Sequence, residues 1–119
     1  MHAKVTYHDP CEIGRYFKIY EEPRKVIRSI PDLDLVEMPR NMEDSWCCGG
    51  GGSANIVHTY LALRVQELRI GESQETGMDT LVTACPSCVR MLELASKRKR
   101  AGMNMIDISE LVLDAIKTT

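Results

Sequence analysis

Five cysteines are the residues of this chain whose types and spacing best fit a chemical role. Two of them, Cys47 and Cys48, are adjacent, and glycines follow at 49–52. Adjacent thiols can face one centre only where the backbone bends sharply. Glycine supplies that freedom because it reaches positive φ without steric cost and lets the main chain approach a bound group closely. This stretch therefore predicts a ligand pair on a tight loop.

The other cysteines are Cys11, Cys85 and Cys88. A gap of two residues lets the sulfurs of Cys85 and Cys88 bind one centre, but this pair alone would also fit a thioredoxin-like redox motif or half of a zinc site. Thiolates select zinc, copper(I) or iron–sulfur clusters. A closed structural zinc site takes four ligands. Five cysteines exceed that number, which favours an iron–sulfur centre over zinc.

Composition limits the other possibilities. The chain has 119 residues and a formal net charge of −2, so we expect one domain over 1–119 and no nucleic-acid partner. No apolar run reaches the roughly 18–20 residues of a membrane span, so we expect no direct membrane insertion. We expect a cytoplasmic chain with reduced cysteines, associated with a membrane only through a partner. The odd cysteine count also disfavours a disulfide framework.

Four strands and several helices must position these thiols. β-Branched and alternating runs predict strands at 4–8, 32–38, 80–84 and 105–108. Helices are expected over 14–20, from Pro23 to Pro31, from the N-cap Ser53 to about Glu75, from Cys88 to the basic run 97–100, and from the N-cap Ser109. Their expected apolar faces include Val26, Ile27, Ile30, Ala54, Val57, Leu61, Val65, Leu68, Leu92, Leu94, Leu111 and Ile116.

Strands that alternate with helices predict an α/β domain with a roughly four-stranded parallel sheet and right-handed crossovers. Ligands of such sheets bind beyond the carboxyl ends of the strands. Cys11 follows the first strand, Cys47 and Cys48 follow the second, and Cys85 and Cys88 follow the third. We therefore expect all five cysteines at one edge of the sheet.

Three motifs carry a family resemblance that covers nearly the whole chain. They are His8-Asp9-Pro10-Cys11 with Gly14-Arg15, Cys47-Cys48-Gly49-Gly50-Gly51, and Thr83-Ala84-Cys85-Pro86-Ser87-Cys88. Together they resemble the cysteine-rich CCG domain of the heterodisulfide reductase catalytic subunit. The same domain occurs in the iron–sulfur subunit of glycolate oxidase and in related lactate-utilisation and thiol:fumarate reductase proteins.

The resemblance implies a function and a ligand set. All five cysteines would bind a [4Fe-4S] cluster, of a noncubane type in the reductases, at which a disulfide is reduced in one-electron steps. Gly49 and Gly50 would offer backbone N–H groups to the cluster sulfurs. Related domains with fewer ligands are associated with zinc, so the alternative is a zinc-bound structural or docking module. A third possibility is a metal-free thiol redox protein that uses Cys85 and Cys88.

The sequence also departs from the family pattern. Relatives usually carry two such domains in tandem, so we expect this chain to be the C-terminal domain of a larger oxidoreductase subunit or a separate subunit. Iron–sulfur or flavin domains of a redox complex would be its partners, and the isolated domain would not be active. Glu12 stands where many relatives carry histidine, which removes a proton donor at that position. His8 remains a candidate proton donor.

Overall fold

The computed structural model describes residues 3–10, 17–42, 45 and 59–117. Some of the sequence predictions fall outside these residues: the placement of Cys11, Cys47, Cys48 and the glycines at 49–52, and the N-cap Ser53. The described part of the chain contains the whole predicted sheet and most of the helical residues, together with Cys85 and Cys88.

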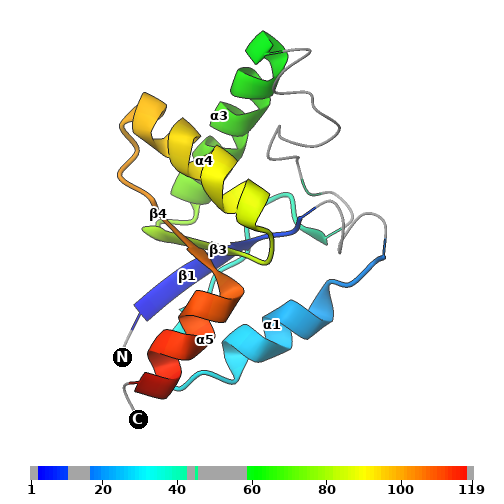
Figure 1. Ribbon diagram of the computed structural model, residues 1–119, viewed down its shortest axis with the longest axis vertical. Coiled ribbons are helices and arrows are strands. Elements are labelled where there is room, and N and C mark those ends of the chain that lie inside the picture. The colour runs from blue at the N-terminus through cyan, green and yellow to red at the C-terminus, as the bar shows by residue number, and fades with distance from the viewer. Residues whose placement is uncertain (1–2, 11–16, 43–44, 46–58, 118–119) are drawn as a thin grey trace.

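The four strands form one parallel sheet, as predicted (Figure 1). They are β1 (Ala3–His8), β2 (Leu33–Leu35), β3 (Thr80–Thr83) and β4 (Asn104–Asp107), arranged in the order β2-β1-β3-β4. In the register of the central pair, Val5 lies opposite Thr80 and His8 opposite Thr83. The ends of β1 and β3 therefore lie side by side at the carboxyl edge. β2 is shorter than the predicted 32–38, although the Val36 N–H still donates to the Val5 carbonyl (2.9 Å).

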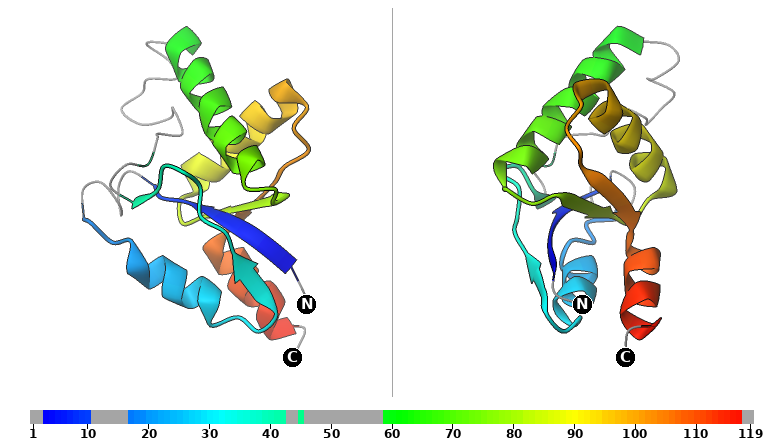
Figure 2. Two further views of the ribbon diagram at one scale, coloured as in Figure 1. Left: turned by 180° about the vertical axis from the view of Figure 1, so that it is seen from behind. Right: turned by 90° about the vertical axis from the view of Figure 1, so that its left-hand side faces the viewer.

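Helices cover both faces of the sheet (Figures 1 and 2). One face carries α1 (Glu21–Arg28) and α5 (Ile108–Lys117), and the other carries α3 (Thr59–Glu75) and α4 (Pro86–Lys99). Each face has its own apolar core. The first contains Val5, Tyr7, Ile27, Ile30, Leu33, Val82 and Leu111. The second contains Met38, Ile70, Leu81, Cys88, Leu92, Ala95 and Met103. Among the described residues, no helix is long and apolar enough to cross a membrane.

Two predictions near α1 were wrong in part. Residues 17–20, predicted as the end of a short helix, are not helical. Lys18 has a φ of 55°, which lies in the left-handed region and cannot continue a right-handed helix. In α1 itself, Ile27 is buried but Val26 is 40% exposed. The inward position three residues before Ile27 belongs to Arg24, which is fully buried.

Helix α3 buries a different face from the one predicted. Leu61 and Leu68, expected in the core, are 61% and 46% exposed. The buried side chains are Gln66, Arg69, Ile70, Glu72 and Ser73. A polar helix face can be buried only where its groups find partners. The inward face of α3 thus indicates a polar cluster beneath it.

The ends of the last two helices also differ in detail from the prediction. Helix α5 begins at Ile108, and Asp107 rather than Ser109 caps it, because the Asp107 carboxylate accepts the Ser109 N–H (3.0 Å). Helix α4 ends as expected within the basic run, at Lys99, and Arg100 closes it with a φ of 53°. Leu94 and Ile116, expected in the core, are 41% and 64% exposed.

Candidate metal centre

Two of the five cysteines lie at the N-terminus of α4. Cys85 is the N-cap residue, Pro86 opens the helix and Cys88 lies in the first turn. The Cys85 side chain makes no capping hydrogen bond, so capping of α4 does not occupy its thiol. Cys88 is 2% exposed, and neither cysteine forms a disulfide. Unpaired N–H groups at a helix N-terminus favour negative charge, so this position suits thiolates.

These two thiols lie where the chain changes direction across the sheet. From β1 the chain crosses to β2 on one side, and from β2 it returns past β1 to β3 on the other. The point between β1 and β3 is therefore the topological switch point of the sheet, the usual binding place of doubly wound folds. Pro10-Cys11 follows the end of β1, and Cys85 follows β3.

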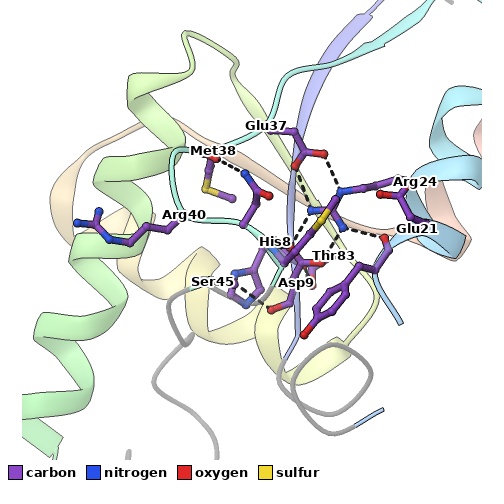
Figure 3. A network of polar contacts seen from close by, with 12 residues as sticks. His8, Asp9, Glu21, Arg24, Glu37, Met38, Arg40, Ser45 and Thr83 are labelled. Carbon is purple, nitrogen blue, oxygen red and sulfur yellow. Dashed lines mark hydrogen bonds and ion pairs between the residues drawn. The ribbon is translucent and has the colours of Figure 1, made fainter. Parts of the chain in front are cut away.

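A buried ion cluster lies immediately beside the end of β1 (Figure 3). The Arg24 guanidinium, with no exposed side-chain surface, makes two hydrogen bonds of 2.7 Å to the Asp9 carboxylate. It makes two more to Glu37, of 2.6 and 3.0 Å, so that Arg24 lies between the two carboxylates. It also donates to the Tyr20 carbonyl (2.8 Å) and lies 5.0 Å from the centroid of the Tyr7 ring. Arg24 thus joins α1 to the segments after β1 and β2.

Asp9 also holds the segment that follows β2. Its carboxylate accepts the N–H of Met42 at 2.7 Å. Met42 has a φ of 54°, a left-handed conformation that is unfavourable for a residue with a long side chain. The charge-assisted hydrogen bond from its N–H offsets that cost. This segment runs toward the adjacent cysteines, which follow Ser45 by two and three residues.

A second buried arginine, Arg69 of α3, holds Ser45 itself. Its guanidinium donates to the Ser45 hydroxyl (2.9 Å), to His8 Nδ1 (2.8 Å), to the Arg40 carbonyl (2.7 Å) and to Glu72 (3.2 Å). The Ser45 hydroxyl also lies 3.4 Å from the Asp9 carbonyl. Arg69 therefore explains the polar inward face of α3, since it links that helix to the residues before two cysteine segments.

The three hydroxyl or carboxylate residues that precede the cysteines share one spacing. Asp9 stands two residues before Cys11, Ser45 two residues before Cys47, and Thr83 two residues before Cys85. Thr83 donates to the His8 carbonyl at 2.9 Å. We call Asp9, Ser45 and Thr83 the anchor residues. All three are at most 7% exposed, and they belong to one hydrogen-bonded cluster with His8, Arg24 and Arg69.

Comparison with known proteins identifies the family of this chain. The model of a cysteine-rich domain family, CCG, matches residues 5–93. The chain belongs to the CCG family. The match confirms the resemblance seen in the sequence, and it includes β2, β3 and all of β1 from Val5 onward.

Curated relatives of this CCG domain are redox proteins. The chain is 41% identical over 117 residues to a protein of Chromohalobacter salexigens named probable membrane-anchored ferredoxin. It is 38% identical over 112 residues to one subunit of the dihydromethanophenazine:CoB–CoM heterodisulfide reductase from Methanosarcina barkeri. It is 31% identical over 118 residues to a probable iron-sulfur-binding oxidoreductase, FadF, of Bacillus subtilis. These alignments cover 98%, 94% and 98% of this chain but only 17%, 27% and 17% of the relatives.

Burial and charge set the protonation of the polar groups in the CCG domain. Burial alone would lower the pKa of Arg24, but its hydrogen bonds to Asp9 and Glu37 raise it above the ordinary value. Burial lowers the pKa of Arg69, and Glu72 acts in the opposite direction. Burial, followed by the negative charge of Asp9, raises the pKa of Tyr7. Because their carboxylate partners lie in contact, the two guanidinium groups bring no large excess of positive charge to this edge.

His8, the candidate proton donor, is 1% exposed, and Arg69 contacts its ring at Nδ1. Because Nδ1 accepts the hydrogen bond from Arg69 Nε, the network assigns the proton of a neutral imidazole to Nε2. Donation from Nδ1 would require Arg69 to move. Any proton that His8 supplies must therefore leave from Nε2.

The sequence analysis did not identify the arginine cluster. Arg24 could have been found, because it stands three residues before buried Ile27 on the same face of α1. For Arg69 no such signal exists, since the apolar spacing of α3 favours the wrong face. Within the described ranges, no group of three or more His, Cys, Asp and Glu side chains forms a metal site by itself. Cys85 and Cys88 are the described members of the predicted ligand set.

Proposed function

We propose that this CCG domain binds an iron–sulfur cluster through Cys11, Cys47, Cys48, Cys85 and Cys88 and transfers electrons within a larger oxidoreductase. The anchor residues carry the proposal, because three segments that lead to cysteines are bonded together at one sheet edge. A fully extended chain spans at most about 7 Å over two residues. That reach allows Cys11, Cys47 and Cys85 to share one centre, which supports the proposal.

The chemistry of the described donors fits such a group. Cys85 and Cys88 lie at a helix N-terminus outside any disulfide, one half-buried and one buried, and soft thiolate ligands suit iron–sulfur clusters. A cluster with thiolate ligands carries negative charge, which the N–H groups of the first turn of α4 stabilise. The apolar core that contains Cys88, Leu92 and Met38 excludes water from one side of this position.

A bound cluster would supply one-electron transfer, and the protein residues would hold and shield it. Cys85 and Cys88 would provide two sulfur ligands from a single turn of helix. Gly49 and Gly50 would allow close approach of the main chain. His8 would carry its proton on Nε2 while Arg69 fixes the ring through Nδ1. We propose a [4Fe-4S] cluster, of the noncubane type found in the heterodisulfide reductase family, and a disulfide or related redox substrate.

The short coverage of the relatives supports a role within a larger assembly. Relatives are named as a subunit of a reductase, a ferredoxin and an oxidoreductase, and each is several times longer than this chain. We propose that the domain works with other iron–sulfur or flavin domains and that it is not active alone. The physiological electron donor would be one of these domains.

Metal analysis after anaerobic reconstitution with iron and sulfide tests the proposal. We expect iron and acid-labile sulfide together, with about four irons per chain, as a [4Fe-4S] cluster requires. The variant Cys85→Ala should hold less iron than the unmodified protein. Ser87→Ala, which changes an exposed residue between the two cysteines, should hold the same amount. One zinc per chain, with no iron retained after reconstitution, would instead establish the alternative of a zinc-bound docking module.

A further inference from the structure

Arg24 and Arg69 are the two largest fully buried side chains among the described residues, and both lie at the carboxyl edge. Burying an arginine is costly, and a buried ion pair adds little net stability compared with apolar packing. A gain in stability alone therefore does not explain why so small a domain buries two arginines. Their shared position next to the anchor residues points to a geometric role.

We propose that Arg24 and Arg69 are positioning residues that set the distance between the cysteine segments. This inference rests on the proposed function, in that the positioned cysteines are the ligands named there. Arg24 holds the Asp9 carboxylate, and Arg69 holds the Ser45 hydroxyl. Thr83 completes the set by bonding the His8 carbonyl.

The hydrogen-bond geometry favours positioning over charge compensation. Arg24 uses its planar fork against two carboxylates at once, with four hydrogen bonds between 2.6 and 3.0 Å. Such paired contacts fix orientation as well as distance, and lysine cannot reproduce them. Because Asp9 and Glu37 neutralise this guanidinium, little of its charge remains for a bound anion.

Arg69, on the other face of the sheet, also makes several hydrogen bonds at once. Its guanidinium donates to four different groups: a hydroxyl, a ring nitrogen, a main-chain carbonyl and a carboxylate. These partners come from β1, from the segment after β2 and from α3 itself. Arg69 therefore fixes Ser45 relative to His8, and with it the start of the segment that leads to Cys47.

Ser45→Ala is the most direct variant, because it removes one hydroxyl and leaves both arginines, the helices and the apolar cores in place. Ser45→Thr keeps the hydroxyl and serves as the conservative rescue. Arg24→Lys keeps the charge of Arg24 but loses its fork. Ile27→Val is the control for a merely structural effect, since it weakens the core in α1 without touching a polar group of the cluster.

Cobalt(II) binding to the reduced, metal-free protein measures how well the thiols are positioned. Thiolate-to-cobalt absorption reports the ligands, and its titration gives the dissociation constant. We expect Ser45→Ala and Arg24→Lys to weaken binding by about 10- to 100-fold, as loss of groups that orient metal ligands does elsewhere. Ser45→Thr should restore binding. Ile27→Val should leave binding unchanged, even if its melting temperature falls as far as that of Ser45→Ala.

Equal cobalt affinity in all variants would overturn the positioning role, as would an equal loss in Ile27→Val. Absence of thiolate–cobalt absorption in the unmodified protein would overturn it too, because the thiols would then not be held together. The proposed function fails separately. In that case the protein would bind cobalt as expected but take up no iron and sulfide on reconstitution.

Discussion

Several residues at the carboxyl edge carry polar groups whose burial is normally unfavourable. Asp9, Arg24 and Arg69 are accepted in the interior because each has several partners at hydrogen-bonding distance. Tyr7 is different. Its ring lies against Arg24, but its hydroxyl is buried without a partner among the described residues. This hydroxyl gives a direct test of the packing at the residue scale.

We predict that Tyr7→Phe stabilises the metal-free protein by about 1 kcal/mol, because it removes an unpartnered buried hydroxyl and keeps the ring over Arg24. Urea unfolding at neutral pH measures the change in the free energy of unfolding. Tyr60→Phe, at a side chain that is 77% exposed, is the matched control and should have no effect. A clear loss of stability in Tyr7→Phe would mean that the hydroxyl has a partner.

The same side chain predicts a dependence on alkaline pH. The pKa of Tyr7 is raised above its ordinary value of 10.0 in the folded state, chiefly by burial. Above that pH the unfolded chain loses the tyrosine proton while the folded chain keeps it, so the free energy of unfolding falls as pH rises. Tyr7→Phe should reduce this fall by up to about 1.4 kcal/mol per pH unit. Identical slopes in both proteins would contradict the burial of Tyr7.

At the scale of elements, α3 shows what sequence patterns can and cannot predict. The helix itself and its end at Glu75 were expected, because a long segment with apolar residues at helical spacing reliably predicts a helix. Its inward face was not, because Arg69 and Glu72 are buried by partners that come from distant segments. Local apolar spacing could not reveal those partners, whereas the sheet and its parallel strands follow from strand–helix alternation.

We therefore predict unequal effects for two apolar residues of α3. Ile70→Ala should destabilise the protein by about 2–5 kcal/mol, since Ile70 is fully buried in the core under α4. Leu68→Ala, at a half-exposed position on the face that the sequence favoured, should cost much less. Thermal or urea unfolding compares the two. A larger loss in Leu68→Ala would show that the sequence had predicted the correct face.

The end of α4 gives a second prediction at this scale. Arg100 adopts a left-handed conformation that closes the helix, and this conformation costs a non-glycine residue roughly 1–2 kcal/mol. Arg100→Gly should therefore raise the free energy of unfolding by about 1 kcal/mol. Lys99→Gly, one residue earlier and inside the helix, should lower it by about 1 kcal/mol. Denaturant midpoints that shift in the same direction would contradict this assignment of the helix end.

At the scale of the whole molecule, the parallel sheet has the strands from which the positions of the cysteines were predicted. The sequence predicted that every cysteine follows a strand, and the parallel sheet confirms the strands on which that prediction depends. The structure adds the anchor residues, which the sequence could not supply because their hydrogen bonds join positions up to 75 residues apart. The gathering of all five cysteines at one edge stays a prediction.

The central claim is that the five cysteines bind one iron–sulfur cluster. Mössbauer spectroscopy of the protein reconstituted anaerobically with ⁵⁷Fe and sulfide tests it most directly, together with the same measurement on Cys11→Ala. We predict signals of coupled cluster iron in the unmodified protein and a changed or depleted spectrum in Cys11→Ala. A spectrum with only isolated, nonspecifically bound iron, or one that is identical in both proteins, would contradict the claim.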